Sequence, residues 1–229
     1  MMTLLAIDTA TQFISIALHD GQQMLAEQTW RSENHHTVEL APAVRGLMAH
    51  AGLTPADLAA LAVAVGPGSY TGLRIGVALA KGIAGAHNLP LVGVSSFDIL
   101  AAQQPRSTGA LVLVLPAGRG RVVTARYTWR KGAWKVRGDA QNVDWDSLLA
   151  SIDAATTISG EISAEGHGKI EAAQMDGLPV SLTPAALRMR RAGFLAEEAW
   201  ARLRADGDPV AFDAAAVAPI YVKTKDSPL

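Results

Sequence analysis

The sequence predicts an α/β protein whose mixed sheets are flanked by helices. Short apolar or alternating runs, the pattern typical of strands, recur along the chain, and segments with apolar residues at helical spacing lie between them. In the first hundred residues the order is strand, strand, strand, helix, strand, helix, strand, which is typical of a mixed sheet with helices packed on it. A length of 229 residues allows one large core or two small ones.

The first thirty residues predict three antiparallel strands. A short apolar run at 4–7 is closed by Asp8, and residues 13–18 then place apolar side chains on one face by alternation. The dipeptide Asp20-Gly21 suits a two-residue hairpin turn, because both positions tolerate a positive φ. Residues 24–30 form the expected return strand, so the chain should open with a three-stranded antiparallel meander.

Two helices and two buried strands are expected next. Apolar residues recur at helical spacing over 37–50. A continuous apolar run at 61–65 is typical of a strand covered on both faces, and Gly66-Pro67-Gly68-Ser69 ends it. A long helix is predicted at about 70–86, followed by a buried strand at 91–94.

The second half of the chain repeats these patterns less regularly. The runs expected to form strands are 110–115, 156–159 and a hairpin of 122–129 with 134–137, and those expected to form helices are 145–152 and 185–204. We therefore divide the chain into an N-terminal lobe, residues 1–104, and a smaller C-terminal lobe, residues 105–229. The last helix, at about 185–206, is strongly amphipathic, and we expect it to pack back on the N-terminal lobe.

Composition argues against several classes of protein. Twenty Lys and Arg against 21 Asp and Glu give a formal net charge of −1, so the chain as a whole has no cationic field for nucleic acid. The absence of cysteine removes disulfides, thiolate metal sites and cysteine nucleophiles. The N-terminus has neither a basic region nor a long apolar core, and no later run approaches about 18 apolar residues. We expect a cytoplasmic protein without a membrane span.

Two loops that follow predicted strands have the composition of phosphate-binding turns. Asp8-Thr9-Ala10-Thr11 is similar to the opening of the sugar kinase, heat-shock and actin superfamily, where this loop faces a nucleotide phosphate and the Asp can hold Mg²⁺ through water. The alternative is that Asp and Thr satisfy their own turn amides. Gly66-Pro67-Gly68-Ser69 opens a helix whose unpaired amides and dipole suit an anion, although a tight turn with Ser69 as N-cap is the other interpretation.

Four motifs together resemble the bacterial TsaB family, also called YeaZ. They are Asp8-Thr9-Ala10-Thr11, the loop and helix GPGSYTGLRIG at 66–76, the preceding His36-Thr37-x-x-Leu40-x-Pro42, and the terminal Pro219-x-Tyr221. The resemblance is dense over residues 1–100 and thin over 105–215. It implies the actin-like (ASKHA) two-lobed fold and a role in making N6-threonylcarbamoyladenosine in tRNA, at the adenosine next to the anticodon.

The resemblance also implies partners. TsaB-like proteins work beside the catalytic subunit TsaD, which transfers the threonylcarbamoyl group from its adenylate, and the ATPase TsaE. The expected assemblies are a homodimer when the chain is alone and a complex with TsaD and TsaE, through which tRNA is reached. No cofactor is expected on the isolated chain, and ATP or ADP at the interface of the complex is left open.

Residues for a reaction of its own are absent at the corresponding positions. The catalytic relative has two histidines four apart, because such a pair can share one metal ion, and here these positions are Ser96 and Leu100. Where family members commonly have Asp-Ala-Arg, this chain reads Pro116-Ala117-Gly118-Arg119-Gly120-Arg121, so a phosphate contact and a plain β-turn are both open. We expect no catalytic residue and no metal, that is, a non-catalytic subunit that supports TsaD.

Three alternatives stay open. A small-molecule kinase of the same superfamily would need an acidic catalytic residue and an intact second phosphate loop, and a metalloprotease would need metal ligands. An interaction module outside tRNA modification is the third. The group Arg188, Arg190 and Arg191 on the last predicted helix is either a contact for tRNA or the solvated face of that helix.

Small residues on the long helix suggest a docking face. Gly72, Gly76, Ala80 and Ala84 recur every fourth residue and form a ridge without bulk, which lets another element approach closely. Together with the apolar-rich helix 37–50, this ridge predicts one surface that serves both self-association and TsaD. The residues assigned to it are His36, Leu40, Val44, Leu47, Tyr70, Thr71, Gly72, Leu73, Arg74, Gly76, Val77, Ala80 and Ala84.

Overall fold

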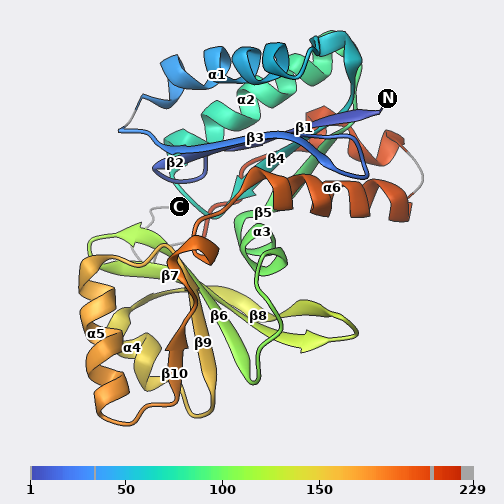
Figure 1. Ribbon diagram of the computed structural model, residues 1–229. Helices are drawn as coiled ribbons and strands as arrows, with labels where there is room; N and C mark the ends of the chain where they lie inside the picture. Colours follow the sequence, from blue (N-terminus) through green and yellow to red (C-terminus); the bar gives the residue numbers. More distant parts are fainter. Residues whose placement is uncertain (1, 34, 207–208, 223–229) are drawn as a thin grey trace. The chain divides into compact units, whose positions relative to one another are not determined.

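The computed structural model describes residues 2–33, 35–206 and 209–222 and divides the chain into two compact units (Figure 1). Unit 1 is Met1–Ile99 with Arg190–Ile220, and unit 2 is Leu100–Met189 with Tyr221–Leu229. The expected lobes, 1–104 and 105–229, differ from these units because Arg190–Ile220 belongs to unit 1. The expectation that the last helix packs back on the N-terminal lobe agrees with this assignment. No helix in the described part of the chain is both long enough and apolar enough to span a bilayer.

Unit 1 is built on a five-stranded mixed sheet with the order β3-β2-β1-β4-β5. The predicted antiparallel meander is confirmed, and the two later strands run parallel to β1. The strands are β1 Thr3–Asp8, β2 Phe13–His19, β3 Met24–Arg31, β4 Leu58–Gly66 and β5 Leu91–Ser95.

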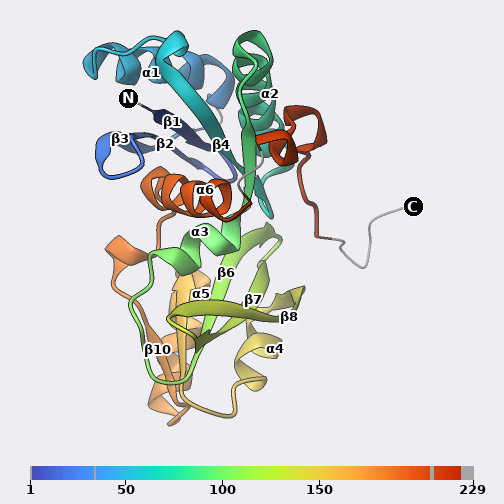
Figure 2. The ribbon, with the colours of Figure 1, turned by 90° about the vertical axis from the view of Figure 1, so that its right-hand side faces the viewer.

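Helices cover both faces of this sheet (Figures 1 and 2). Two helices, α1 His36–His50 and α2 Tyr70–His87, lie on one face, and α6 Ala192–Asp206 lies on the other. Strand alternation divides the core accordingly, since Leu5 and Ile7 of β1 join the cluster under α1 and α2 while Leu4 and Ala6 join the cluster under α6. The short elements of this unit are η1 Pro55–Asp57, η3 Pro209–Phe212 and η4 Ala214–Ala216, and α3 Ser96–Ala102 follows β5.

The long helix α2 begins and ends at residues suited to helix termini. Ser69 is its N-cap, and the Ser69 hydroxyl oxygen accepts a hydrogen bond from the Gly72 amide at 3.2 Å. Asn88 closes the helix in the left-handed conformation with φ of 54°, which Asn tolerates better than most residues. The predicted helix at 70–86 is therefore confirmed to within one residue.

The interface between α6 and the sheet consists largely of alanine. Ala60, Ala62 and Ala64 of β4 face α6 and pack against small residues of that helix, Ala192, Ala196 and Ala199. All six are buried. Small side chains on both surfaces let helix and strand approach closely, so this interface has little room for a larger residue.

The single helix expected over about 185–206 is instead two separate elements, η2 Ala185–Leu187 and α6. The N-terminal amides of α6 are bound by residues far away in the sequence. The Ala192 amide donates to the Ser15 hydroxyl at 2.8 Å, and the Gly193 amide donates to the Glu27 carboxylate at 2.8 Å. A carboxylate is favourable at a helix N-terminus, so the sheet itself determines where α6 begins.

Unit 2 repeats the connection order of unit 1, with a meander followed by helix, strand, helix and strand. Its five-stranded sheet has the order β10-β9-β6-β7-β8. The strands are β6 Ala110–Gly118, β7 Arg121–Arg130, β8 Ala133–Asp144, β9 Thr156–Gly160 and β10 Val180–Leu182, and the helices are α4 Trp145–Ala150 and α5 Ala164–Met175. Val112, Ile158, Trp145 and Ile170 belong to its core. The sequence analysis did not predict α3, α5 or β10.

A bulky residue should disturb the alanine interface. We expect Ala62→Leu to lower the free energy of unfolding by about 1–3 kcal/mol, because the added carbons lie between β4 and α6. Ala78→Leu adds the same atoms on the exposed side of α2 and should change stability by less than about 0.5 kcal/mol. Urea unfolding of both variants measures the difference, and equal stability would contradict close packing of α6.

Candidate functional site

The two predicted phosphate-type loops meet in unit 1. Asp8-Thr9-Ala10-Thr11 follows β1, Gly66-Pro67-Gly68-Ser69 joins β4 to α2, and β1 and β4 are parallel neighbours in the sheet. The Ser69 amide donates to the Ala10 carbonyl oxygen at 2.6 Å, which joins the two loops directly. All four residues of the first loop are buried. The structure therefore brings together the residues that the sequence analysis grouped as phosphate-loop-like.

The glycines of the second loop and of α2 are required by contact with the first loop. A Cβ atom on Gly68 would overlap the Ala10 carbonyl oxygen, and one on Gly72 or Gly76 would overlap the Thr9 carbonyl or hydroxyl oxygen. The Thr9 hydroxyl donates to the Gly72 carbonyl oxygen at 2.7 Å. The small residues thus let the chain's own loop lie against α2, with no space for a side chain between them.

This packing corrects our assignment of the ridge. The structure turns Gly72, Gly76, Ala80 and Ala84 toward the core of unit 1, where all four are buried. The same holds for most of the predicted docking residues, which contact the chain's own sheet and loop: His36, Leu40, Val44, Leu47, Leu73 and Val77. Tyr70, Thr71 and Arg74 are exposed. The small residues face inward because they accommodate the Thr9 loop.

His36 supports the first loop from α1. Its Nε2 atom lies 2.8 Å from the Thr11 carbonyl oxygen, and the residue is 7% exposed. A carbonyl oxygen only accepts, so the His36 ring carries its proton on Nε2 in this contact. The motif His36-Thr37 that contributed to the resemblance therefore has a structural role in holding the loop.

A buried ion pair closes the first loop. The Arg190 Nε atom donates to Asp8 Oδ2 at 2.8 Å, and Arg190 Nη2 lies 3.4 Å from Asp8 Oδ1 and 2.9 Å from the Thr11 hydroxyl. Asp8 Oδ1 also accepts the Ala10 amide at 2.8 Å. Both charged side chains are 1% exposed. Removing two charges from water is costly, and the several hydrogen bonds to this pair offset that cost.

The Asp8 carboxylate is not open to a metal ion in this arrangement. Both Asp8 oxygens are engaged by Arg190 or the Ala10 amide, and the amides of Ser69 and Gly72 are used within the chain. Arg190 supplies the positive charge that a bound cation would otherwise bring to Asp8. Among the residues that the structure describes, no three His, Asp or Glu side chains gather in a group able to hold a metal.

Sequence reasoning missed the role of Arg190. It treated Arg188, Arg190 and Arg191 as one group on a helix, but their side chains go to three different partners. Arg191 forms an ion pair with Glu27, and Arg188 Nη1 lies 2.7 Å from His167 Nε2. These arginines therefore have internal partners, and a solvated helix face does not describe them. The sequence signal was too weak to find this, since Asp8 and Arg190 are 182 positions apart.

The other positions compared with the catalytic relative are structural. Ser96 and Leu100 are buried in α3. The segment 116–121 forms the end of β6 and a tight turn into β7, in which Arg119 and Gly120 have φ of 51° and 71°. Positive φ at both central residues is the geometry of a two-residue hairpin turn. The plain turn that the sequence analysis left open is what the structure shows.

Comparison with known sequences gives three results. The family model described as TsaD, tRNA N6-adenosine threonylcarbamoyltransferase, matches residues 24–187. A Bacillus subtilis protein, tRNA threonylcarbamoyladenosine biosynthesis protein TsaB, is 38% identical over 162 residues, which make up 69% of this chain and 71% of that protein. The protein of the same name from Escherichia coli is 38% identical over 129 residues, or 55% of each chain.

Solved structures agree on the fold. YeaZ from Pseudomonas aeruginosa has a TM-score of 0.76 at 27% identity, and the alignment covers 97% of this chain and 100% of that one. Component A of (R)-2-hydroxyglutaryl-CoA dehydratase from Acidaminococcus fermentans has a TM-score of 0.51 at 12% identity, covering 89% and 100%, and shares the fold alone. The predicted fold class, mixed sheets flanked by helices in the actin-like arrangement, is confirmed.

The glycines of α2 provide a matched pair of variants. We expect Gly76→Ala to lower the free energy of unfolding by about 1–3 kcal/mol, because its Cβ would overlap the Thr9 hydroxyl. Gly82→Ala lies in the same helix with no atom within 4 Å of its Cβ, and should raise stability by about 0.5–1 kcal/mol. Thermal and urea unfolding compare the two, and a stabilising Gly76→Ala would refute tight packing of the loop.

The buried ion pair should show strong coupling. Arg190→Met leaves the Asp8 carboxylate buried without its charge partner and is expected to cost about 3–5 kcal/mol of stability. The double variant Asp8→Asn with Arg190→Met carries no unpaired charge and should lose clearly less than the sum of the two single changes. A double-mutant cycle in urea measures this coupling, and strictly additive effects would show that the pair contributes no interaction.

Proposed function

This chain belongs to the TsaB family, also called YeaZ, and we propose that it takes part in forming N6-threonylcarbamoyladenosine in tRNA as a non-catalytic partner of TsaD. The observation that carries the proposal is the 38% identity to TsaB over about two thirds of both chains. The small-molecule kinase and the metalloprotease are not favoured by any comparison.

The arrangement around Asp8 supports a non-catalytic role. A nucleotide-binding lobe of this fold needs a carboxylate at the end of its first strand that is open to a hydrated cation, and here Arg190 binds that carboxylate. Buried Ser96 and Leu100 stand where the catalytic relative has its histidine pair. One observation favours a catalytic role instead, since residues 24–187 match the transferase family model. Transferase activity of the chain itself is therefore the second candidate function.

We place the partner surface on the outer face of α1 and α2. Val38 is 66% exposed and Tyr70 is 54% exposed, so this face offers an apolar and an aromatic side chain to a partner. The Arg74 guanidinium lies over the Tyr70 ring at 3.8 Å from its centre, which gives the surface an aromatic and cationic anchor of the kind enriched in protein interfaces. We propose that the same face serves homodimerisation and TsaD, so the two associations compete.

The remaining partners follow from this placement. TsaE and tRNA would be engaged through the complex with TsaD. ATP or ADP, if bound, would lie at the interface with a partner, because the loop pair of unit 1 uses its own donors internally.

Reconstitution tests the proposed function. TsaD, TsaE, unmodified tRNA and the substrates of TsaD are combined with and without this chain, and modified adenosine is measured by mass spectrometry. We expect modification only when the chain is present, and none from the chain alone. Transfer by the chain without TsaD would establish the second candidate, and equal modification with and without the chain would refute both.

Surface variants test the docking face. We expect Tyr70→Ala and Arg74→Ala to weaken binding to TsaD and self-association together, each by about tenfold or more, since Tyr and Arg anchors often contribute over 1–2 kcal/mol. Met175→Ala on α5 removes another exposed side chain, 86% accessible, and serves as the control. Calorimetry and analytical ultracentrifugation measure the two affinities. Loss of only one association would show that the surfaces are separate.

A further inference from the structure

The positive charges of this chain are unevenly distributed. Residues 99–138 contain eight of the 20 Lys and Arg residues and no Asp or Glu, although the whole chain has a net charge of −1. This segment includes β6, β7 and the first part of β8. Unit 2 therefore carries a local cationic region that the overall charge conceals.

Strand alternation gathers four of these cations on one face of the β7–β8 hairpin. In the antiparallel register Arg126 is opposite Arg137, Thr128 is opposite Lys135, and Arg130 is opposite Ala133. Side chains two positions apart point to the same side of a strand, so these residues share a face. We call this surface the cationic face and define it by Arg126, Arg130, Lys135 and Arg137.

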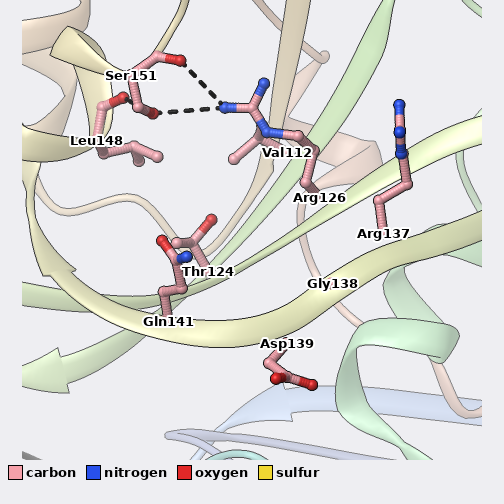
Figure 3. A pocket seen from close by; sticks show the side chains of 9 residues that line it. All are labelled: Val112, Thr124, Arg126, Arg137, Gly138, Asp139, Gln141, Leu148 and Ser151. Carbon is pink, nitrogen blue, oxygen red and sulfur yellow. Dashed lines mark hydrogen bonds between the residues drawn. The ribbon is translucent and has the colours of Figure 1, made fainter.

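The cationic face is unfavourable by itself. Like charges directly opposite each other destabilise a pair of strands, and the Arg126–Arg137 pair is such a case. The Arg126 guanidinium donates to the carbonyl and hydroxyl oxygens of Ser151, both at 3.4 Å, and both acceptors are neutral. Figure 3 shows Arg126 and Arg137 at one pocket, which Asp139 also lines. An anion would relieve this repulsion.

A pocket lies between these groups. It has a volume of about 130 Å³ and is lined by two cations, one carboxylate, three neutral polar residues, a glycine and two apolar residues: Arg126, Arg137, Asp139, Thr124, Gln141, Ser151, Gly138, Val112 and Leu148 (Figure 3). One water takes about 30 Å³ in the liquid, so the pocket admits a group the size of a phosphate but not a nucleobase with its sugar. Guanidinium groups bind phosphate oxygens in a two-pronged manner.

We propose that the cationic face binds the phosphate backbone of RNA, with one phosphate held between Arg126 and Arg137. Arg130 and Lys135 continue the row of charges along the hairpin. Same-face residues on a strand are about 6.7 Å apart, so the cationic face presents positive charges at regular intervals to a polyanion. The inference rests on the proposed function, in which tRNA is the substrate of the complex.

Binding of an unmodified tRNA transcript tests the proposal. The full chain, alone and with TsaD and TsaE, is titrated with tRNA at several salt concentrations in a filter-binding assay. We expect Arg126→Gln with Arg137→Gln, and separately Arg130→Gln with Lys135→Gln, to weaken binding several-fold. The magnitude of the slope of log affinity against log salt should fall by about one to two for each double variant, because a protein with fewer cations releases fewer counterions from the RNA on binding.

A matched control removes two charges elsewhere. Arg31→Gln with Arg106→Gln changes exposed residues outside both the cationic face and the proposed partner surface and should leave both the affinity of the isolated chain and its salt slope unchanged. Circular dichroism verifies folding. Arg130 and Lys135 are exposed, so this pair keeps the test informative if the Arg126 variant unfolds. Equal losses in the control and the cationic-face variants would overturn the proposal.

Two further measurements distinguish RNA from a small phosphate ligand and from an acidic protein surface. Inorganic phosphate and ATP are titrated while the arginine Nε signals are followed by NMR, and shifts at Arg126 and Arg137 without any change in tRNA binding would identify a small phosphate ligand instead. Loss of TsaD binding in the variants with unchanged tRNA binding would identify an acidic protein surface. Either result overturns the RNA assignment. A wild-type chain that binds tRNA through these residues but does not affect modification would refute the proposed function alone.

Discussion

The buried pair of Asp8 and Arg190 is the constraint on which unit 1 depends. It joins the end of the first strand to a residue two positions before α6, so it ties the two segments of unit 1 together at the first loop. A charge removed from water must be compensated, and here the compensation comes from another part of the same chain. Because of this contact, the Asp8 carboxylate is bound within the chain.

The glycines of α2 also hold the first loop within the chain. In many proteins a glycine-rich turn before a helix leaves space and free amides for phosphate, but here the Thr9 loop takes that space. Gly72 and Gly76 are then necessary because the loop backbone lies against the helix. The sequence has the pattern of a binding site, and the structure uses these residues to hold its own loop.

Local patterns made much of unit 1 predictable, whereas long-range contacts did not. The meander followed from alternation in 13–18, which depends only on neighbouring residues. The two-residue turn expected at Asp20-Gly21 was wrong, since β2 and β3 are joined by four residues, Asp20–Gln23, and Asp20 does not have a positive φ. The direction of the glycine ridge could not be inferred, because small residues suit a partner and the chain's own loop equally well. Helix α5 was not predicted because Gly166 and Gly168 weaken the helical periodicity of its apolar residues. The partner of Arg190 could not be inferred either, since no local pattern encodes a contact across 182 positions.

Unit 1 is assembled from two separated stretches of sequence, and this has a consequence for its synthesis. The first 99 residues leave the ribosome with one face of their sheet bare, since α6 is made more than 90 residues later. Most of unit 2, Leu100–Met189, is continuous and can fold during that interval. The nascent protein must therefore carry an exposed alanine-rich sheet surface until translation passes α6, a period in which chaperones or premature aggregation would act on it.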